Sequence, residues 1–480
     1  MDKPMKKNLL ALLLLVTMIV NIFAMASCNL IPGLGGNGDE NEIEAGKINI
    51  TFYHTMGENL RTVLNNYIEE FEKEYPFINV IHSQVGSYDD VRDTISTELT
   101  EGAQPNLAYC YPDHVALYNV ALAVVVLDNY IDYQGDYTFT KVDGDPITVS
   151  NIGLTQAQKD DFIQGYYEEG KQFGDGKMYT LPLSKSTEVL YYNADFFAKE
   201  GLKVPTTWDE MEEVCATIKA KYPDSTPLGY DSEANWFITM CEQLKTPYTS
   251  ADKSTGHFLF DNAENHAFVK QFREWFVKGY VTTQDILGGY TSDIFTKQQS
   301  FMSIGSSAGA KHQAPDDGSF KVGIAPIPQA DPDNNKVISQ GPSLCILESG
   351  NKDEDMASWL FMKYLTTTVG FQAEFSEASG YVPVIKSVAN DPYYKEFLDS
   401  ADGYDTGIAA LSAKVCLEQE SYYYTSPAFN GSSTARDQVG ALLQKCFAID
   451  RNLNDAAVDA AIEAAFKEAV AKCKYEVGNK

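Results

Sequence analysis

The side chains that most often catalyse reactions or hold metals occur in this sequence without the spacing that such chemistry needs. The six histidines never form an HExxH pattern, and no P-loop pattern is present. The 67 acidic residues are so numerous that pairs of carboxyl groups must arise by chance, so they do not by themselves indicate glycoside hydrolysis. We therefore expect no catalytic residue, no metal site and no cofactor. A glycoside-acting enzyme is kept only as the least favoured alternative.

The thiols are widely and irregularly spaced. No CxxC pair occurs, which argues against a zinc site and against a redox dithiol. Several unpaired thiols would be unusual in an oxidising compartment, so we expect most of them to be small apolar core residues. The eight cysteines are Cys28, Cys110, Cys215, Cys241, Cys345, Cys416, Cys446 and Cys473.

The first 28 residues have the composition of an export signal. Three lysines form a basic start, an apolar run follows from about residue 9 to residue 26, and small residues precede Cys28. Residues 25–28, MASC, resemble a bacterial lipobox, although Leu is usual where Met25 stands. The resemblance implies that Cys28 is lipidated and becomes the new N-terminus. The alternative is an uncleaved anchor, because about 20 apolar residues can span a bilayer. Both alternatives place the protein on the extracytoplasmic face of the cell membrane and tethered to it.

Residues 29–46 are rich in glycine and acidic side chains and are predicted to be a flexible spacer. The folded part is expected to begin near residue 47 and is long enough for two domains. The net charge of −30 makes the chain a poor nucleic-acid binder and would repel it from anionic lipid. Its membrane link is therefore expected to be the N-terminus.

Strand and helix patterns alternate after the spacer. Apolar residues alternate over 48–53, follow helical spacing over 60–75, and alternate again over 78–83. A second helix is predicted at 91–99 and a third strand at 107–111. This succession predicts an α/β fold with helices on both faces of a parallel or mixed sheet.

Two further segments stand out. Residues 131–155 are predicted to be a loop excursion because they are rich in Asp, Gly, Thr and Tyr. A final helix is predicted after Asn454. Its apolar face would consist of Val458, Ile462, Ala465, Phe466, Ala469 and Cys473.

Eight sequence blocks, in order, resemble the family 1 extracellular solute-binding proteins, the capture subunits of ABC importers. The nearest resemblance is to the glycerol-3-phosphate and sugar-binding branch, on the evidence of Ser186-Thr187, Ser306-Ser307 and Gly341. The blocks are residues 48–54, 86–90, 104–107, 176–182, 189–193, 205–211, 295–304 and 380–384.

The resemblance implies an α/β fold of the type II periplasmic-binding-protein kind, with a ligand cleft between two lobes joined by crossing segments. It implies a monomer that closes its lobes on a carbohydrate or polyol (phosphate) and delivers it to ABC permease subunits. A sensor or an adhesin with the same fold is the alternative. The implied lobe 1 comprises 47–182 and 300–340, lobe 2 comprises 186–298 and 343–480, and crossings lie near 182–186, 301–306 and Gly341.

The resemblance also implies ligand-binding residues. Aromatic rings suit the C–H faces of a sugar, and Tyr88, Trp236 and Tyr381 are the candidates, each with packing as its alternative role. Asp113 follows a predicted strand end, where open α/β sheets bind ligands, but it can equally cap a helix. The remaining candidates for contact with ligand hydroxyl groups are Ser184, Ser186, Ser306, Ser307 and the backbone of Gly341.

The residues available for phosphate binding resemble those of the glycerol-3-phosphate branch less well than the sequence blocks do. Its members use an arginine in the C-terminal segment, whereas residues 427–433 here contain no cation. Arg436 is expected on the following helix, and Lys185 would offer only a point charge. The sequence therefore favours a neutral sugar or oligosaccharide over a phosphoester.

Overall fold

Alternating burial defines the first strand. The computed structural model describes residues 42–140, 144, 146–252, 254 and 256–478. The predicted signal at 1–28 and most of the predicted spacer at 29–46 therefore lie outside the described residues. In β1 (Ile48–His54) the side chains of Ile48, Ile50 and Phe52 are buried, as their alternation predicted. Strands β2 and β3 pair in parallel with β1 on its two sides.

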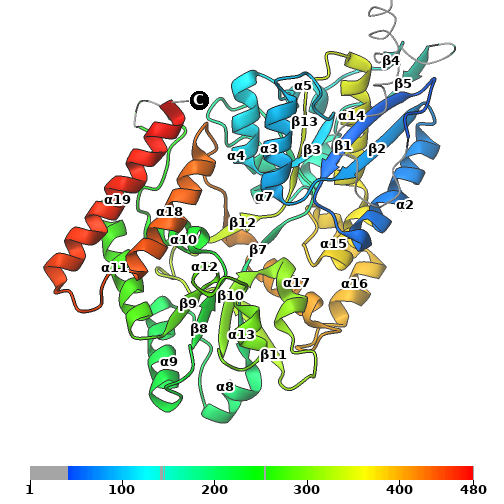
Figure 1. Ribbon diagram of the computed structural model, residues 1–480. Helices are drawn as coiled ribbons and strands as arrows, with labels where there is room; N and C mark the ends of the chain where they lie inside the picture. The colour runs from blue at the N-terminus through cyan, green and yellow to red at the C-terminus, as the bar shows by residue number, and fades with distance from the viewer. Residues whose placement is uncertain (1–41, 141–143, 145, 253, 255, 479–480) are drawn as a thin grey trace, which may run out of the picture. The chain divides into compact units, whose positions relative to one another are not determined.

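A five-stranded sheet forms around β1, in the order β2-β1-β3-β13-β6 (Figure 1). Its last two strands are antiparallel to their neighbours and come from later parts of the chain. The bounds of the other strands are β2 (Ile78–Gln84), β3 (Leu107–Cys110), β6 (Leu181–Pro182) and β13 (Ser343–Ile346).

A seven-stranded sheet has β7 at its centre and runs β14-β12-β7-β10-β8-β9, with β11 also paired to β7. Strand β7 is antiparallel to β10, β11 and β12, so one buried strand holds three others. The strands are β7 (Ser186–Asn193), β8 (Leu228–Tyr230), β9 (Val281–Thr283), β10 (Met302–Ser306), β11 (Val322–Pro326), β12 (Val337–Gln340) and β14 (Tyr423–Tyr424). The predicted loop at 131–155 contains a separate hairpin of β4 (Tyr137–Phe139) and β5 (Ile147–Val149).

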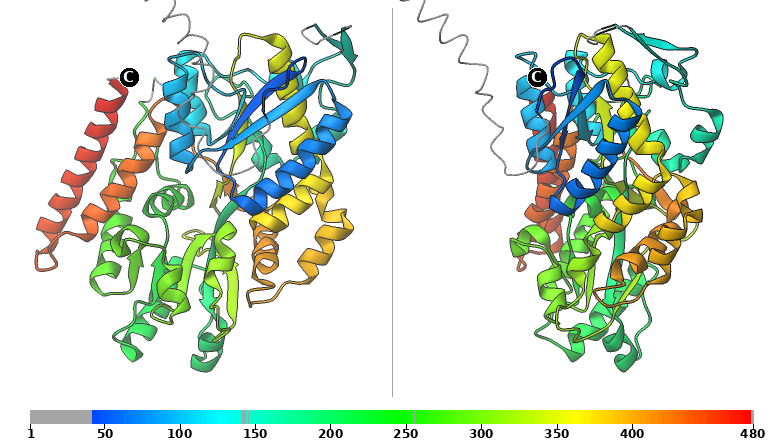
Figure 2. Two further views of the ribbon diagram at one scale, coloured as in Figure 1. Left: turned by 45° about the vertical axis from the view of Figure 1, so that its right-hand side comes forward. Right: turned by 90° about the vertical axis from the view of Figure 1, so that its right-hand side faces the viewer.

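Helices cover both sheets, and the two views of Figure 2 show α19 lying beside α18. Helix α19 buries the face that the sequence predicted for it. The helices before β6 and the first four after β13 are α2 (Glu58–Glu74), α3 (Tyr88–Glu98), α4 (Pro112–Tyr118), η2 (Asn119–Ala121), α5 (Asp128–Ile131), α6 (Gln156–Asp161), α7 (Gln164–Glu169), α14 (Lys352–Thr367), α15 (Val369–Ser379), η4 (Lys386–Asn390) and α16 (Pro392–Asp399). The others are α8 (Ala194–Glu200), α9 (Trp208–Lys221), α10 (Glu233–Leu244), α11 (Ala263–Val277), α12 (Gln284–Leu287), α13 (Ser292–Thr296), η3 (Ser307–Gln313), α17 (Ile408–Glu418), η5 (Glu420–Tyr422), α18 (Ser432–Phe447) and α19 (Asp455–Gly478).

The two sheets are joined by very short segments. Residues 183–185 lead from β6 in the five-stranded sheet to β7 in the seven-stranded sheet, and Gly341-Pro342 leads from β12 back to β13. These are two of the three predicted crossings. The third, near 301–306, does not occur there, because β10 occupies these residues and pairs with β7.

Strand pairing also changes the expected division of the chain. Residues 300–340, expected in lobe 1, carry β10, β11 and β12 of the seven-stranded sheet. Residues 343–346, expected in lobe 2, form β13 of the five-stranded sheet, and α14 packs on β1 and β13. Sheet membership follows the hydrogen-bond partners of each strand, which no stretch of sequence displays by itself.

Residues Glu42–Lys480 form one compact unit that holds both sheets. The seven described cysteines are all buried and free, as apolar core residues would be. Among the described helices, none combines the length and the apolar character needed to cross a bilayer.

Candidate functional site

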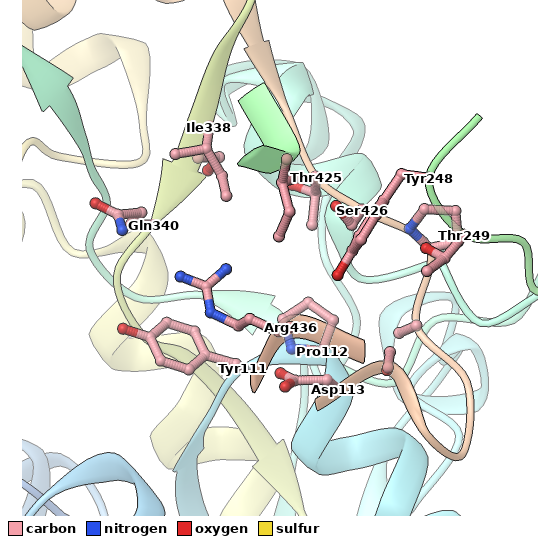
Figure 3. A pocket seen from close by; sticks show the side chains of 15 residues that line it. Tyr111, Pro112, Asp113, Tyr248, Thr249, Ile338, Gln340, Thr425, Ser426 and Arg436 are labelled. Carbon is pink, nitrogen blue, oxygen red and sulfur yellow. The ribbon is translucent and has the colours of Figure 1, made fainter. Parts of the chain in front are cut away.

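A small cavity of about 120 Å³ lies where α4, β12 and the start of α18 meet. Tyr111 reaches it from the position between β3 and α4, Asp113 from the first turn of α4, Gln340 from the end of β12, and Arg436 from α18. Figure 3 shows these side chains gathered around one space with Tyr248 and Ser426. Because β3 and β12 belong to different sheets, both halves of the fold contribute to its wall.

Several polar atoms at the small cavity have no hydrogen-bond partner among the described residues. They are the hydroxyl oxygens of Tyr248, Thr249 and Ser426 and the amide oxygen of Gln340. Buried polar groups in folded proteins are almost always paired, so four orphans in one cavity indicate a place for a polar ligand. Hydroxyl groups can donate and accept, which makes this set complementary to the hydroxyl groups of a polyol.

A large cavity of about 990 Å³ adjoins the small one and shares Gln340 and Arg436 with it. Its wall also contains Glu188, Asp231 and Ser306. Pockets of this size class can enclose a ligand of several rings.

Arg436 is held in place by α10. Its Nη2 donates to Asn235 Oδ1, and Asn235 Nδ2 donates in turn to Glu188 Oε1 at 2.9 Å. Ser232 caps α10 by accepting the backbone N–H of Asn235 at 3.2 Å, which fixes Asn235 in the first turn of the helix. No other hydrogen bond of the Arg436 guanidinium is found among the described residues, so most of its donors are available to a ligand.

The carboxyl groups around Arg436 differ in acidity. Burial raises the pKa of Glu188 to about 7, against the opposing effect of hydrogen bonds from Tyr230 and Asn235 and of the Arg436 charge. Burial likewise raises the pKa of Asp231. Burial also acts to raise the pKa of Asp113, but His114, the Ser433 hydroxyl and Arg436 together outweigh it and lower that pKa.

A third cavity, of about 300 Å³, lies between α3 and α4 and includes Tyr88, Asp113 and Arg436 in its wall. Ser87 and Asp90 form a capping box at the start of α3, which places Tyr88 in its first turn. The Tyr88 ring stacks on Tyr111, with ring centroids 4.6 Å apart. Tyr381 lies close enough to Tyr88 to raise the pKa of the Tyr88 hydroxyl, which burial raises most.

Three of the predicted contact residues therefore lie in cavity walls: Asp113, Tyr88 and Ser306. Tyr381 is near one of them, Tyr88, but is not in the walls of these three cavities. Asp113 also accepts a hydrogen bond from Ser433 Oγ at 2.6 Å, so its carboxylate connects α4 with α18. The predicted capping role for Asp113 is wrong, because α4 begins at Pro112 with Tyr111 as its N-cap residue and Asp113 lies within the first turn.

Another group of predicted residues lies at the crossing segments and outside the walls of these three cavities. Ser307 Oγ accepts the backbone N–H of Thr187 at 3.1 Å, and Ser186 Oγ accepts from Ser306 Oγ at 3.5 Å. Ser184 is buried, and its hydroxyl has no partner among the described residues. Gly341 accepts a hydrogen bond from Lys185 through its carbonyl oxygen.

Lys185 is not free to bind a phosphate. Its Nζ lies 2.6 Å from Glu169 Oε1 in a fully buried ion pair, and it also donates to Ser343 Oγ at 3.0 Å. A buried charge with a partner and further hydrogen bonds is a structural feature of the crossing. Arg436 is instead the cation that lines all three cavities, while Lys297 and Lys311 also line the large one and Arg92 the third.

Trp236 lies in the core beneath the seven-stranded sheet, where it has no exposed surface. It stacks between Phe272, at a centroid distance of 3.8 Å, and Tyr230, at 4.8 Å. Packing, the alternative given for it, is what the structure shows. Its position on α10 directly follows Asn235, so it anchors the turn that holds Arg436.

Residues 305–309 spell GxSxG, a pattern that in hydrolases presents a nucleophilic serine at a strand-to-helix turn. Here Ser307 is buried, and no histidine hydrogen-bonds to it among the described residues. A nucleophilic serine needs an adjacent base, and the Ser307 hydroxyl instead accepts a backbone N–H at the end of the crossing. The described residues also contain no group of side chains arranged to hold a metal ion.

Sequence reasoning missed Glu188, Asn235, Gln340 and Tyr248, and it placed Arg436 on the following helix without a site role. Arg436 lies on α18, as expected, but its long side chain returns to the cavities. The sequence offered one signal for a site role of Arg436: it is the only arginine between Arg273 and Arg451.

Comparison with known proteins gives a consistent result. The sn-glycerol-3-phosphate-binding periplasmic protein UgpB of Escherichia coli K12 is 23% identical over 383 residues, which cover 76% of this chain and 81% of that protein. The cyclic alpha-maltosyl-1,6-maltose binding protein from Arthrobacter globiformis has a TM-score of 0.67 at 18% identity, over 90% of this chain and 100% of that one. UgpB from Mycobacterium tuberculosis in complex with glycerophosphocholine has a TM-score of 0.65 at 17% identity, over 89% and 99% of the two chains.

These likenesses confirm the predicted two-lobed α/β fold of the periplasmic binding proteins. Residues 66–398 match the family described as bacterial extracellular solute-binding proteins. The match spans more than half of the chain and includes strands of both sheets. This chain therefore belongs to the bacterial extracellular solute-binding proteins.

Proposed function

We propose that this protein captures a hydroxyl-rich solute, a carbohydrate or a polyol with or without a phosphate group, in the cavities around Arg436. The observation that carries the proposal is the set of unpaired hydroxyl and amide groups at the small cavity. A ligand that pairs with them would recover hydrogen bonds worth about 1 kcal/mol each.

Lobe closure is the proposed means of capture. The cavity walls combine residues next to β3 of one sheet with residues of β12 and α18 on the other side. A ligand that contacts both lobes favours the closed form by its difference in affinity between the two forms. The segments 183–185 and Gly341-Pro342 that connect the two sheets are short, which suits a hinge.

Arg436 widens the proposed ligand class. The sequence favoured a neutral sugar because no cation was found near residues 427–433, and Arg436 supplies one. The named ligands of the relatives, glycerol 3-phosphate, glycerophosphocholine and maltosyl sugars, span both kinds of solute. A guanidinium group can bind a phosphate bidentately or donate to sugar hydroxyl groups.

We further propose that the protein is a monomeric lipoprotein, anchored through Cys28 on the extracytoplasmic face of the cell membrane, that delivers its ligand to ABC permease subunits. It is proposed to leave the ligand chemically unchanged, since Ser307 lacks the partners of a nucleophile. The alternatives make different predictions. A sensor would pass its ligand to a receptor, an adhesin would bind a surface, and a glycosidase would release a turnover product.

A thermal-shift screen tests the capture of a solute. The protein without residues 1–41 is melted with neutral mono- and oligosaccharides, polyols, polyol phosphates and glycerophosphodiesters. A ligand that binds the native state raises the melting temperature as its concentration exceeds the dissociation constant. We expect a rise of a few degrees with one chemically related set. A flat response across the whole panel would contradict the proposal, and turnover of a chromogenic glycoside would favour the enzyme alternative.

A further inference from the structure

The side-chain amide of Asn235 lies between the guanidinium group of Arg436 and the carboxyl group of Glu188 in the wall of the large cavity. Asn235 accepts from Arg436 through Oδ1 and donates to Glu188 through Nδ2, so its two ends match the two charges. The other carboxylate oxygen of Glu188 accepts from the Tyr230 hydroxyl at 2.6 Å. Arg436, Asn235 and Glu188 therefore form a hydrogen-bonded chain from α18 through α10 to β7 along the cavity wall.

Glu188 is buried, with 1% of its surface exposed, and its surroundings supply little compensating charge. Tyr230 on β8 donates to it, Asp231 follows β8, and Tyr424 on β14 adds a second phenol nearby. The adjacent strands β10 and β12 present the uncharged Ser306 and Gln340 to the same cavity.

The surrounding helices also present charged groups to the large cavity. They are Arg436 on α18, Lys311 and His312 on η3, and Asp293 on α13 with Lys297 directly after it. The charge of Arg436 lowers the pKa of Glu188, while the charge of Asp231 raises it. An incoming anion at Arg436 would therefore meet an ionised Glu188 across a single amide, and the burial of Glu188 limits how far solvent screens that repulsion.

We propose that Glu188 is a specificity-determining residue that admits an anionic group to Arg436 only when its carboxyl group is protonated. The proton comes from solvent: one proton binds to Glu188 as the anion binds to Arg436, and it returns to solvent when the anion leaves. This inference rests on the proposed function, because it assigns the charge selectivity of the same cavity.

The sign of the pH dependence follows from this coupling. The pKa of Glu188 in the free protein is about 7, so its carboxyl group is largely neutral at pH 6 and largely ionised at pH 8. Affinity for an anion of fixed charge should therefore fall about tenfold between pH 6 and pH 8, because one proton is linked to binding. Affinity for a neutral sugar or polyol should stay nearly constant over the same range.

Isothermal titration with sodium sulfate at a fixed ionic strength tests the inference, since sulfate keeps its charge from pH 6 to pH 8. The wild-type protein is compared with Glu188→Gln, which keeps an acceptor but cannot ionise, and with Glu242→Gln. Glu242 is a matched control because it lies on α10, burial raises its pKa, and it is absent from the three cavity walls. We expect the tenfold dependence in the wild type and the control, and a flat profile for Glu188→Gln.

A second measurement uses the wild-type protein alone and so does not depend on the folding of a variant. Binding heats at pH 7.5 in buffers of different ionisation enthalpy give the number of protons taken up, which we expect to lie well above zero. Zero uptake, sulfate binding that does not vary with pH, or no sulfate binding at all would overturn the role of Glu188. If neutral sugars bind in the thermal screen while sulfate does not, the inference fails and the proposed function stands. If nothing in the screen binds, the proposed function fails as well.

Discussion

At the scale of single residues, Arg436 has the greatest influence on what the cavities can bind. Its guanidinium lines all three of them, yet only one of its hydrogen bonds goes to the described protein residues. A hydrogen bond from a charged donor to a charged acceptor contributes more than one to a neutral acceptor. The size of the loss on removing Arg436 therefore reports the charge of the natural ligand.

We expect Arg436→Ala to weaken binding of an anionic ligand by about 10- to 100-fold and of a neutral ligand by only about 3- to 10-fold. Titration calorimetry with the ligand found in the thermal screen measures the difference. Arg451→Ala serves as the control, because Arg451 lies in the exposed turn before α19. Equal affinities for Arg436→Ala and the wild type would remove Arg436 from the site.

The candidate site could be predicted from sequence only in part. Asp113 was found because it directly follows a buried strand, and Tyr88 because it lies in a recognisable block. The roles of Arg436, Glu188 and Tyr248 depend on which helices and loops meet in space, and no local spacing encodes that meeting. Trp236 shows the reverse case, because an aromatic residue near a polar run is equally compatible with a core position.

At the scale of elements, the crossing segments bring two pieces of backbone unusually close. Gly341 has φ +93°, and a Cβ atom there would lie 2.6 Å from the carbonyl oxygen of Ser184. The buried pair of Lys185 and Glu169 lies at the same place. The elements themselves were largely predictable, since β1 and α19 follow clear apolar patterns. Their sheet membership was not, because β10 resembles any buried strand until its partner is known.

Gly341→Ala should therefore destabilise the protein by about 3 kcal/mol or more, through both its left-handed backbone and the close contact. Gly176→Ala is the control, because Gly176 has φ +75° but nothing near its Cβ position, and it should cost only about 1 kcal/mol. Urea unfolding at constant temperature measures both. If the two variants lose similar free energies of unfolding, the backbone at the crossings accommodates the added methyl group without strain.

At the scale of the whole molecule, the cavity walls draw on both lobes, so ligand binding and lobe position are expected to be linked. The chain is also strongly acidic, which disfavours contact with anionic lipid surfaces along its length. Two global properties follow for testing: the dimensions of the protein with and without ligand, and its attachment to the membrane.

Small-angle scattering should show a smaller radius of gyration when the cognate ligand is added, because closure brings the lobes together. The comparison needs protein without residues 1–41, measured at several concentrations. An unchanged profile with saturating ligand would argue against capture by closure.

Cys28→Ser should release the protein from the cell membrane fraction if Cys28 carries the lipid, because the nucleophilic thiol is lost while the apolar run is kept. Fractionation with immunodetection, and mass spectrometry of the N-terminus, measure the outcome. Continued attachment with the same processing would favour the uncleaved anchor. Cys110→Ser is a poor control for this experiment, since Cys110 is fully buried.

The seven buried thiols among the described residues can report how often the protein opens locally. An alkylating reagent cannot reach a buried sulfur until the surrounding chain opens, so the labelling rate of each cysteine measures how often its neighbourhood unfolds. Cys110 and Cys345 report on the five-stranded sheet, and Cys215, Cys241, Cys446 and Cys473 on the core of the other lobe. Peptide mass spectrometry on the unmodified sequence can thus time the opening of each lobe separately, without any engineered probe.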